Sequence, residues 1–131
     1  MRSVGERGQS RLRVLLVDDS AKVRQTLADL LSALPEIEVV GEAQDGLEAI
    51  HAASKLFPDL IVLDLRMPRA NGFDVLKAIK KENRNCVVIV FSAMADDVCR
   101  QKCLELGARH FFDKVTQFDE FLPAVKALPR K

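Results

Sequence analysis

Four apolar runs in the sequence lead into side chains that can bind ions or react. In order along the chain, these side chains are Asp18 and Asp19 after 14–17, Asp64 after 60–63, Ser92 after 87–91, and Lys114, one residue beyond Asp113, after 110–112. In an open parallel α/β sheet, binding sites form at the carboxyl ends of the strands. If these runs are neighbouring strands, three carboxylates, one hydroxyl and one ammonium group converge at one edge of the sheet.

The adjacent pair Asp18 and Asp19 suggests a metal site. Neighbouring carboxylates close to a third one repel each other unless a cation lies between them. Hard oxygen ligands, few in number and completed by water, suit Mg²⁺. The alternative is that the pair caps the helix that follows, which is common for Asp at such positions. The pair by itself leaves both interpretations open, and its combination with Asp64 and Lys114 favours the metal site.

Asp64 is the candidate nucleophile of the group. A carboxylate that attacks phosphorus forms an aspartyl-phosphate, which is an established covalent strategy. The transferred group requires charge neutralisation, which Mg²⁺ and the ammonium of Lys114 would supply. Ser92 would add a hydroxyl donor. Each residue alone is a weak signal, since Ser after a strand is commonly a turn residue, but the combination is specific.

Strands and helices that alternate along the chain must position these residues. Strands are predicted at 12–17, 37–43, 59–63, 86–91 and 109–112, and helices at 21–33, 46–56, 72–82, 95–106 and 117–128. Ser20 and Asp45 are the N-cap candidates of the first two helices, and Pro35 follows the end of the first. Five strand–helix units predict an α/β fold, a (βα)5 three-layer sandwich with a parallel sheet between two layers of helices.

One residue conflicts with the last predicted helix. Proline in a helix interior removes a hydrogen bond and clashes with the preceding turn, at a cost of about 3 kcal/mol. Pro123 lies in the middle of 117–128. We therefore expect a short turn at 117–121 and a regular helix that starts near Pro123.

Composition limits the class of protein. A chain of 131 residues with 48% hydrophobic and 30% charged residues fits one soluble domain, and its net charge of +1 argues against broad electrostatic binding of nucleic acid or membrane. Three cysteines without framework spacing, Cys86, Cys99 and Cys103, indicate reduced thiols and a cytoplasmic protein. We expect residues 1–11 to be a flexible leader and 12–131 to form the domain.

The site motifs resemble those of receiver domains of bacterial two-component response regulators, among them the chemotaxis regulators. The matching segments are 14–19, 64–72, Ser92-Ala93, Gly107-Ala108, and Phe111 three residues before Lys114. The resemblance covers roughly residues 12–128 and implies a flavodoxin-like sheet of strand order 2-1-3-4-5. It also implies that a histidine kinase or a phosphotransfer protein phosphorylates Asp64, and that the domain is a switch without a turnover substrate of its own.

The resemblance assigns a role to each site residue. Asp18, Asp19, Asp64 and the backbone carbonyl of Arg66 would hold Mg²⁺, and Lys114, Ser92 and Ala93 would bind the phosphoryl group. Ser92 and Phe111 would act as the switch and alter the surface formed by 95–106, 109–112 and 117–128, where an output protein or a second copy of the chain would bind. The output is expected from a separate protein or from an effector domain of a longer regulator.

Two other functions remain as alternatives. An aspartate-nucleophile phosphatase of the haloacid dehalogenase type wants a second Asp two residues after its nucleophile, and Ser20 stands at that position relative to Asp18. A receiver-shaped binding module that no longer takes phosphate would not need the complete set of site residues. One departure from the receiver pattern is that Val115 follows Lys114, where many receivers have a proline after a cis bond. A cis bond before a residue other than proline is costly, so we expect a trans bond here.

Overall fold

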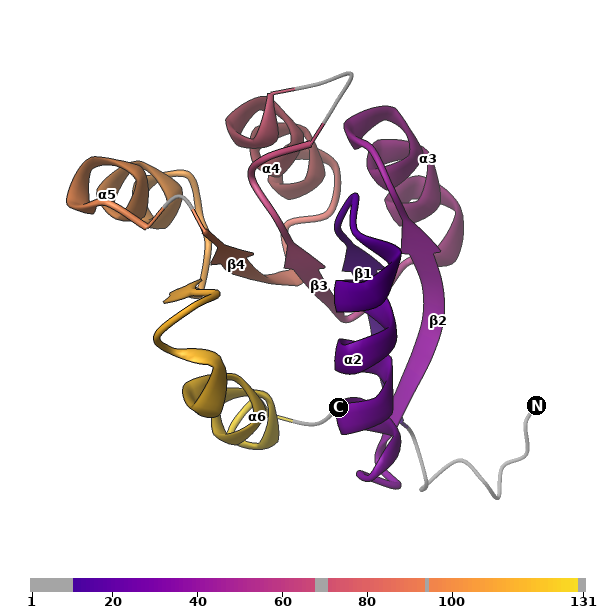
Figure 1. The fold of residues 1–131 in the computed structure, drawn as a ribbon. Coiled ribbons are helices and arrows are strands. Elements are labelled where there is room, and N and C mark those ends of the chain that lie inside the picture. Colours follow the sequence, from indigo (N-terminus) through magenta and orange to yellow (C-terminus); the bar gives the residue numbers. More distant parts are fainter. Residues whose placement is uncertain (1–10, 68–70, 94, 130–131) are drawn as a thin grey trace.

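The computed structural model describes residues 11–67, 71–93 and 95–129 and contains one five-stranded parallel sheet (Figure 1). The strands are β1 (Leu12–Val17), β2 (Ile37–Ala43), β3 (Leu60–Leu63), β4 (Val87–Ser92) and β5 (His110–Asp113). The helices are α2 (Ala21–Ser32), α3 (Gly46–Leu56), α4 (Gly72–Glu82), α5 (Asp97–Glu105) and α6 (Phe118–Lys126). The strand order is β2-β1-β3-β4-β5, and every neighbouring pair is parallel, so the predicted fold is confirmed.

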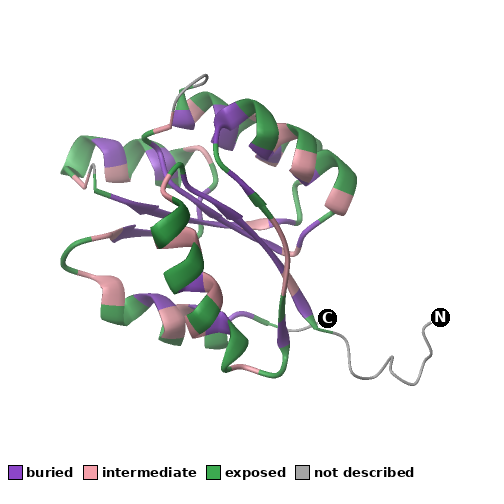
Figure 2. Ribbon diagram, turned by 45° about the vertical axis from the view of Figure 1, so that its right-hand side comes forward, coloured by how far each residue is buried: buried purple, intermediate pink, exposed green. Residues whose placement is uncertain are grey.

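Helices cover both faces of the sheet and create two apolar cores. Helices α3, α4 and α5 pack on one face, and α2 and α6 pack on the other (Figure 1). The central strand β3 contributes alternate residues to the two cores, with Ile61 and Leu63 on one side and Leu60 and Val62 on the other. Figure 2 shows the sheet as a buried layer between helices whose outer sides are exposed. A strand covered on both faces must be apolar throughout, as β3 is.

Side-chain caps fix where four of the helices begin. Ser20, Asp45, Asn71 and Asp96 each accept a hydrogen bond from a backbone N–H in the first turn of α2, α3, α4 and α5, respectively. Such a cap satisfies one of the N–H groups that have no partner inside the helix. The predicted roles of Ser20 and Asp45 are thereby confirmed. Asp96 explains why α5 begins two residues later than predicted.

The prediction for Pro123 is wrong. Helix α6 runs without a break from Phe118 to Lys126 and contains Pro123. Phe121 and Val125 on its inner side are fully buried against the sheet, whereas Pro123 is exposed. The carbonyl left without its helical donor therefore lies in the first turns of a short helix, on a side that water can reach. Burial of the two apolar residues outweighs the local cost of the proline.

Within the residues that the structure describes, no helix is both long and apolar enough to span a bilayer. Residues 1–10, which make up most of the predicted leader, lie outside the described part of the chain.

Candidate phosphoacceptor site

Backbone hydrogen bonds between neighbouring strands bring the predicted site residues to one edge of the sheet. The N–H of Asp18 donates to the carbonyl of Ala43, and the N–H of Asp64 donates to the carbonyl of Val17. The N–H of Lys114 donates to the carbonyl of Ser92 at 3.0 Å. In each of these bonds, the donor is the residue that directly follows the last paired position of its strand. The carboxyl ends of β1, β3 and β5 thus converge, as the sequence predicts.

Three carboxylates and one ammonium group meet at this edge. Asp18, Asp19 and Asp64 each place a carboxylate oxygen within 4.8 Å of the others. The Nζ of Lys114 lies 2.6 Å from Oδ2 of Asp18 and 3.3 Å from Oδ2 of Asp64. The side chains of Asp18 and Asp64 are only 4% and 5% exposed, and that of Lys114 is 19% exposed. Buried charges at these distances interact strongly, because little water screens them.

Burial raises the pKa of Asp64 above its usual value, and the nearby charge of Asp18 raises it further, against the opposing effects of Lys114 and of the Arg66 N–H. Burial alone would lower the pKa of Lys114, but its hydrogen bond to Asp18 and the charge of Asp64 raise it. Lys114 is therefore held as an ammonium ion between two acids. Since the ionised form of Asp64 remains less stable than in water, one lysine does not fully neutralise the cluster.

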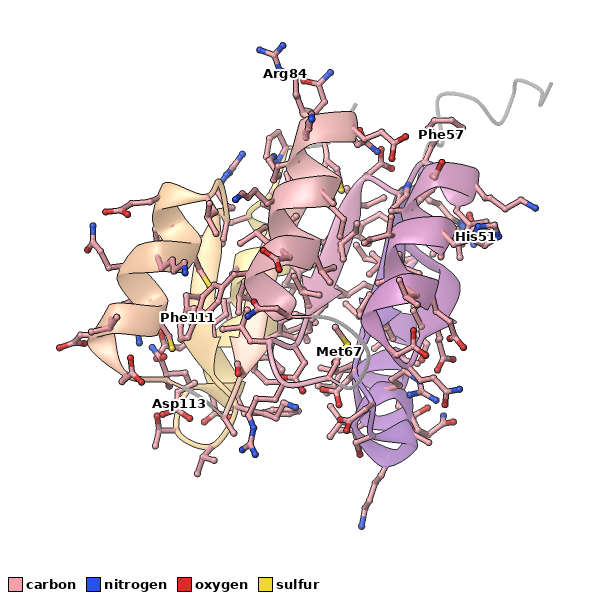
Figure 3. The ribbon with its side chains drawn as sticks, turned by 90° about the horizontal axis from the view of Figure 1, so that it is seen from above. His51, Phe57, Met67, Arg84, Phe111 and Asp113 are labelled. Carbon is pink, nitrogen blue, oxygen red and sulfur yellow. The ribbon has the colours of Figure 1, made fainter. Side chains whose placement is uncertain are left out.

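The cluster opens into a pocket of about 600 Å³. The pocket is lined by Asp19, Asp64, Leu65, Arg66, Met67, Asn71, Gly72, Phe73, Ala93 and Lys114. In Figure 3, Met67 and Asp113 mark this end of the sheet, and Phe57 and Arg84 mark the opposite end. Of the three acids, Asp64 is the one that is both buried and part of the lining, since Asp18 is buried behind the pocket and Asp19 is exposed.

Some predicted residues stand back from this pocket. Ser92 is the last residue of β4 and is fully buried, and Phe111 on β5 is 3% exposed. Neither is among the described lining residues, whereas Ala93 and Arg66 are. Arg66 contacts Asp64 through its backbone N–H, which donates to Oδ1 at 3.2 Å. The metal-binding role of the Arg66 carbonyl and the switch role of Ser92 and Phe111 stay predictions.

Sequence reasoning missed Arg24. Its Nε lies 2.7 Å from Oε1 of Glu42, and its Nη1 donates to the backbone carbonyl of Asp18. Arg24 therefore ties the loop that carries Asp18 and Asp19 to β2. The one signal in the sequence was an arginine near the start of a helix, where a cation interacts unfavourably with the helix dipole. Such a position suggests that nearby acceptors bind the side chain, but it does not say which ones.

The donor set fits a hard divalent cation. Three carboxylates, two of them buried, gather around one point, and a single lysine offsets only part of their charge. Mg²⁺ binds few carboxylate oxygens and keeps several of its waters. Water can reach the cluster on the side of Asp19, which is exposed. Oδ1 of Asp18 does accept a hydrogen bond from the Ser20 N–H just before α2. The gathering of three carboxylates nevertheless suits a site for a metal ion and a phosphoryl group better than a helix cap alone.

Comparison with known proteins decides the family. The model of the response regulator receiver domain matches residues 14–126. The chain belongs to the response-regulator receiver family. This match favours the receiver interpretation over the phosphatase alternative.

The receiver resembles both short and long regulators. It is 36% identical over 118 residues to the chemotaxis protein CheY of Thermotoga maritima, covering 90% of this chain and 98% of that protein. It is 45% identical over 106 residues to a protein-glutamate methylesterase/protein-glutamine glutaminase of Pyrococcus abyssi, covering 79% of this chain but only 28% of that protein. The chain thus spans less than a third of the length of that relative.

Solved structures agree with the sequence matches. The response regulator domain of Thermotoga maritima CheB superposes with a TM-score of 0.77 at 36% identity, over 88% of this chain and 91% of that one. A chain of the CheX-CheY-BeF3-Mg complex of Borrelia burgdorferi gives a TM-score of 0.87 at 26% identity, over 99% of this chain and 98% of that one.

The peptide bond after Lys114 has the predicted geometry. The bond between Lys114 and Val115 is trans, as are the other peptide bonds of the described residues. Cys99 and Cys103 are buried thiols on α5, and His51 is exposed on α3, on the outer side of that helix in Figure 3.

Proposed function

We propose that this receiver accepts a phosphoryl group on Asp64. The observation that carries the proposal is the position of this carboxylate, which is buried, lines the pocket, and lies 3.3 Å from the Lys114 ammonium. Asp18 and Asp19 flank it but differ from it, one being withdrawn from the pocket and the other exposed. The Arg66 N–H holds one oxygen of Asp64, Oδ1, and Lys114 holds the other, Oδ2.

In the proposed reaction, an oxygen of Asp64 forms a bond to phosphorus while the bond from phosphorus to the donor breaks, and the donor leaves with that electron pair. The product is a mixed anhydride of the Asp64 carboxyl with phosphate. Lys114 neutralises the phosphoryl oxygens, and Ser92 and Ala93 contribute hydrogen bonds from the end of β4. Mg²⁺ held by Asp18, Asp19, Asp64 and the Arg66 carbonyl would supply further neutralisation of this charge.

The donor that we propose is a histidine kinase or a phosphotransfer protein, acting in the cytoplasm. The acquired charge would bias Ser92 and Phe111 and so change the surface of α5, β5 and α6. That surface would then bind an output protein, an effector domain or a second phosphorylated chain. Two longer relatives agree with an effector domain, since the receiver matches 28% of the length of one and 33% of the length of the other. We propose that the receiver itself turns over no external substrate beyond its own phosphorylation and dephosphorylation.

Intact mass spectrometry after incubation with acetyl phosphate and Mg²⁺ tests the proposal. We expect one phosphoryl adduct that requires Mg²⁺ and is absent from Asp64→Ala. The matched control is Asp29→Asn, which changes an exposed acid on α2 and should leave the adduct intact. Absence of an adduct under saturating donor would reject phosphorylation and leave a phosphate-independent binding module. Sustained release of phosphate from generic phosphomonoesters would instead support a phosphatase.

A further inference from the structure

The loop after β5 is closed by its own hydrogen bonds. Oδ1 of Asp113 accepts from the N–H groups of Val115 at 2.8 Å and Thr116 at 3.3 Å. The N–H of Gln117 donates to the Asp113 carbonyl at 2.9 Å. Asp113 therefore folds residues 113–117 into a compact turn, and Lys114 lies within it. Side-chain acceptors of this kind commonly organise turns.

A second set of contacts ties this turn to α5. Oε1 of Gln117 accepts from the Asp113 N–H at 2.8 Å and faces Nη2 of Arg100 at 3.4 Å. Nη1 of Arg100 donates to the carbonyl of Phe111 at 2.8 Å. The guanidinium also lies over the ring of Phe111, with Cζ 5.0 Å from its centre. In Figure 3, Phe111 and Asp113 lie along β5, next to α5.

The planar guanidinium makes this arrangement specific. Arginine can donate in two directions while it stacks on an aromatic ring, whereas lysine offers a single point charge. Arg100 and Gln117 are both half-buried, so their contacts are partly shielded from water. We call Arg100 and Gln117 the bracket.

The bracket matters because the contacts of Lys114 with the described residues hold its two ends, the backbone N–H and Nζ. Its N–H bonds the Ser92 carbonyl at 3.0 Å, and its Nζ reaches Asp18 and Asp64 at the far end of a flexible side chain. A lysine side chain loses rotamer entropy when it is fixed. A backbone that is already ordered on both sides of Lys114 limits the motion of that side chain to its own torsions.

We propose that Arg100 and Gln117 are positioning residues for Lys114. The inference rests on the proposed function, because Lys114 matters for phosphorylation only if Asp64 accepts phosphate. The hydrogen bonds themselves can be tested without phosphate.

The test compares four variants of the full chain. Arg100→Ala and Gln117→Ala remove the bracket at either end. Gln117→Glu combined with Glu120→Gln is the conservative rescue, because it keeps an acceptor at 117 and exchanges donor and acceptor between the two positions, where Nε2 of Gln117 donates to Oε2 of Glu120 at 3.3 Å. Gln101→Ala is the matched control, because it shortens an exposed side chain of the same helix. The measurements are the rate of adduct formation with acetyl phosphate and Mg²⁺, amide hydrogen exchange of Asp113 without phosphate, and the ¹³Cε chemical shift of Lys114.

We expect Arg100→Ala and Gln117→Ala to slow adduct formation by about tenfold, since small displacements of a charged group reduce rate steeply. In both variants the Asp113 amide exchanges faster and the Lys114 ¹³Cε resonance moves. The double variant Gln117→Glu/Glu120→Gln and Gln101→Ala stay close to the wild type in all three measurements.

Two results would overturn the inference. One is unchanged exchange and an unchanged Lys114 resonance in both bracket variants. The other is faster exchange with an unaltered Lys114 resonance and rate, which would make the bracket structural only. If the wild type formed no adduct, the proposed function would fail, and the Lys114 resonance would still decide whether the bracket positions this side chain.

Discussion

The protein buries two sets of reactive side chains, the acids at the strand ends and the thiols on α5, and it treats them differently. Asp18 and Asp64 are 3% and 5% exposed, and Cys99 and Cys103 are 9% and 0% exposed, so all four are buried. The acids have a cation within 3.3 Å and lie beside an open pocket. The thiols pack in the core between α5 and the sheet, and burial raises the pKa of Cys103 to about 11.

The difference shows which kind of burial leads to chemistry. A buried group next to a complementary charge and an opening stays ionised and accessible, so it can react. A buried group among apolar neighbours is held in its neutral form and has no path to a reagent. Burial by itself therefore does not identify the functional residues of this protein, whereas burial together with a counter-ion and a pocket does.

The largest effect should come from removing the counter-ion. In Lys114→Met, Asp18 and Asp64 lose their shared cation, and we expect adduct formation to slow by about 100-fold. Without Mg²⁺, we expect the free energy of unfolding to fall by about 2 kcal/mol, less than for a fully enclosed pair because Lys114 is partly exposed. Urea denaturation and intact mass measure the two effects.

Lys55→Met is the control for this prediction, since Lys55 is an exposed cation on α3 away from the site. Added Mg²⁺ should stabilise Lys114→Met more than it stabilises the wild type. Equal stability of Lys114→Met and wild type without Mg²⁺ would contradict the idea that the lysine offsets the buried acids.

An intermediate effect should appear in the pH dependence of stability. The folded-state pKa of Asp64 lies above its unfolded value, chiefly because of burial. Ionised Asp64 therefore costs stability above the folded pKa, and this cost disappears as pH falls below the unfolded value. In Mg²⁺-free buffer, Asp64→Asn should melt at a higher temperature than the wild type near neutral pH, and the difference should shrink in acid.

Asp113 provides the opposite sign as a control. Hydrogen bonds from the Val115 and Thr116 N–H groups, the former the larger influence, lower its pKa. Its ionised form therefore stabilises the fold above the unfolded pKa, and this contribution is lost as pH falls through the folded pKa. Asp113→Asn should be less stable than the wild type near neutral pH and approach it in acid. If both variants shifted in the same direction, the contrast between the two carboxyls would be wrong.

The smallest effect is expected at the thiols. With a pKa of about 11, roughly one Cys103 side chain in a thousand is a thiolate at pH 8. Native protein incubated with iodoacetamide at pH 8 should therefore show little carbamidomethylation by intact mass, and urea-unfolded protein should be modified at Cys86, Cys99 and Cys103. Rapid modification of the native chain would show that α5 opens more readily than its packing indicates.

The sequence predicts the sheet and the edge where the site lies, because both follow from the pattern of apolar residues and from the alternation of strands and helices along the chain. Apolar runs that are buried on both faces, as at 60–63, indicate central strands, and parallel topology brings their carboxyl ends together. Asp18, Asp19, Asp64 and Lys114 therefore meet as expected, although Lys114 follows Asp18 by 96 positions in the sequence.

The sequence did not predict the partners of long side chains. It also did not predict where tertiary packing outweighs a local preference. Arg24 donates to the backbone carbonyl of Asp18 and Arg100 to that of Phe111, and the spacing of these residues does not indicate the pairing. At Pro123 the local penalty is visible in the sequence, but the burial of Phe121 and Val125 that outweighs it depends on the whole fold. Which groups pair in the folded chain, and whether local or tertiary interactions prevail at a given residue, depend on the whole fold. A single sequence does not contain this information in a readable form.

The most direct test of the account is to locate the phosphoryl group among three neighbouring carboxylates. Protein treated with acetyl phosphate and Mg²⁺ is reduced with borohydride, which converts an aspartyl-phosphate to homoserine with release of phosphate, and peptide mass spectrometry then finds the converted residue. We predict homoserine at position 64, with Asp18 and Asp19 unchanged. Conversion at position 18 or 19, or unmodified Asp64 in protein that carries the adduct, would contradict the account.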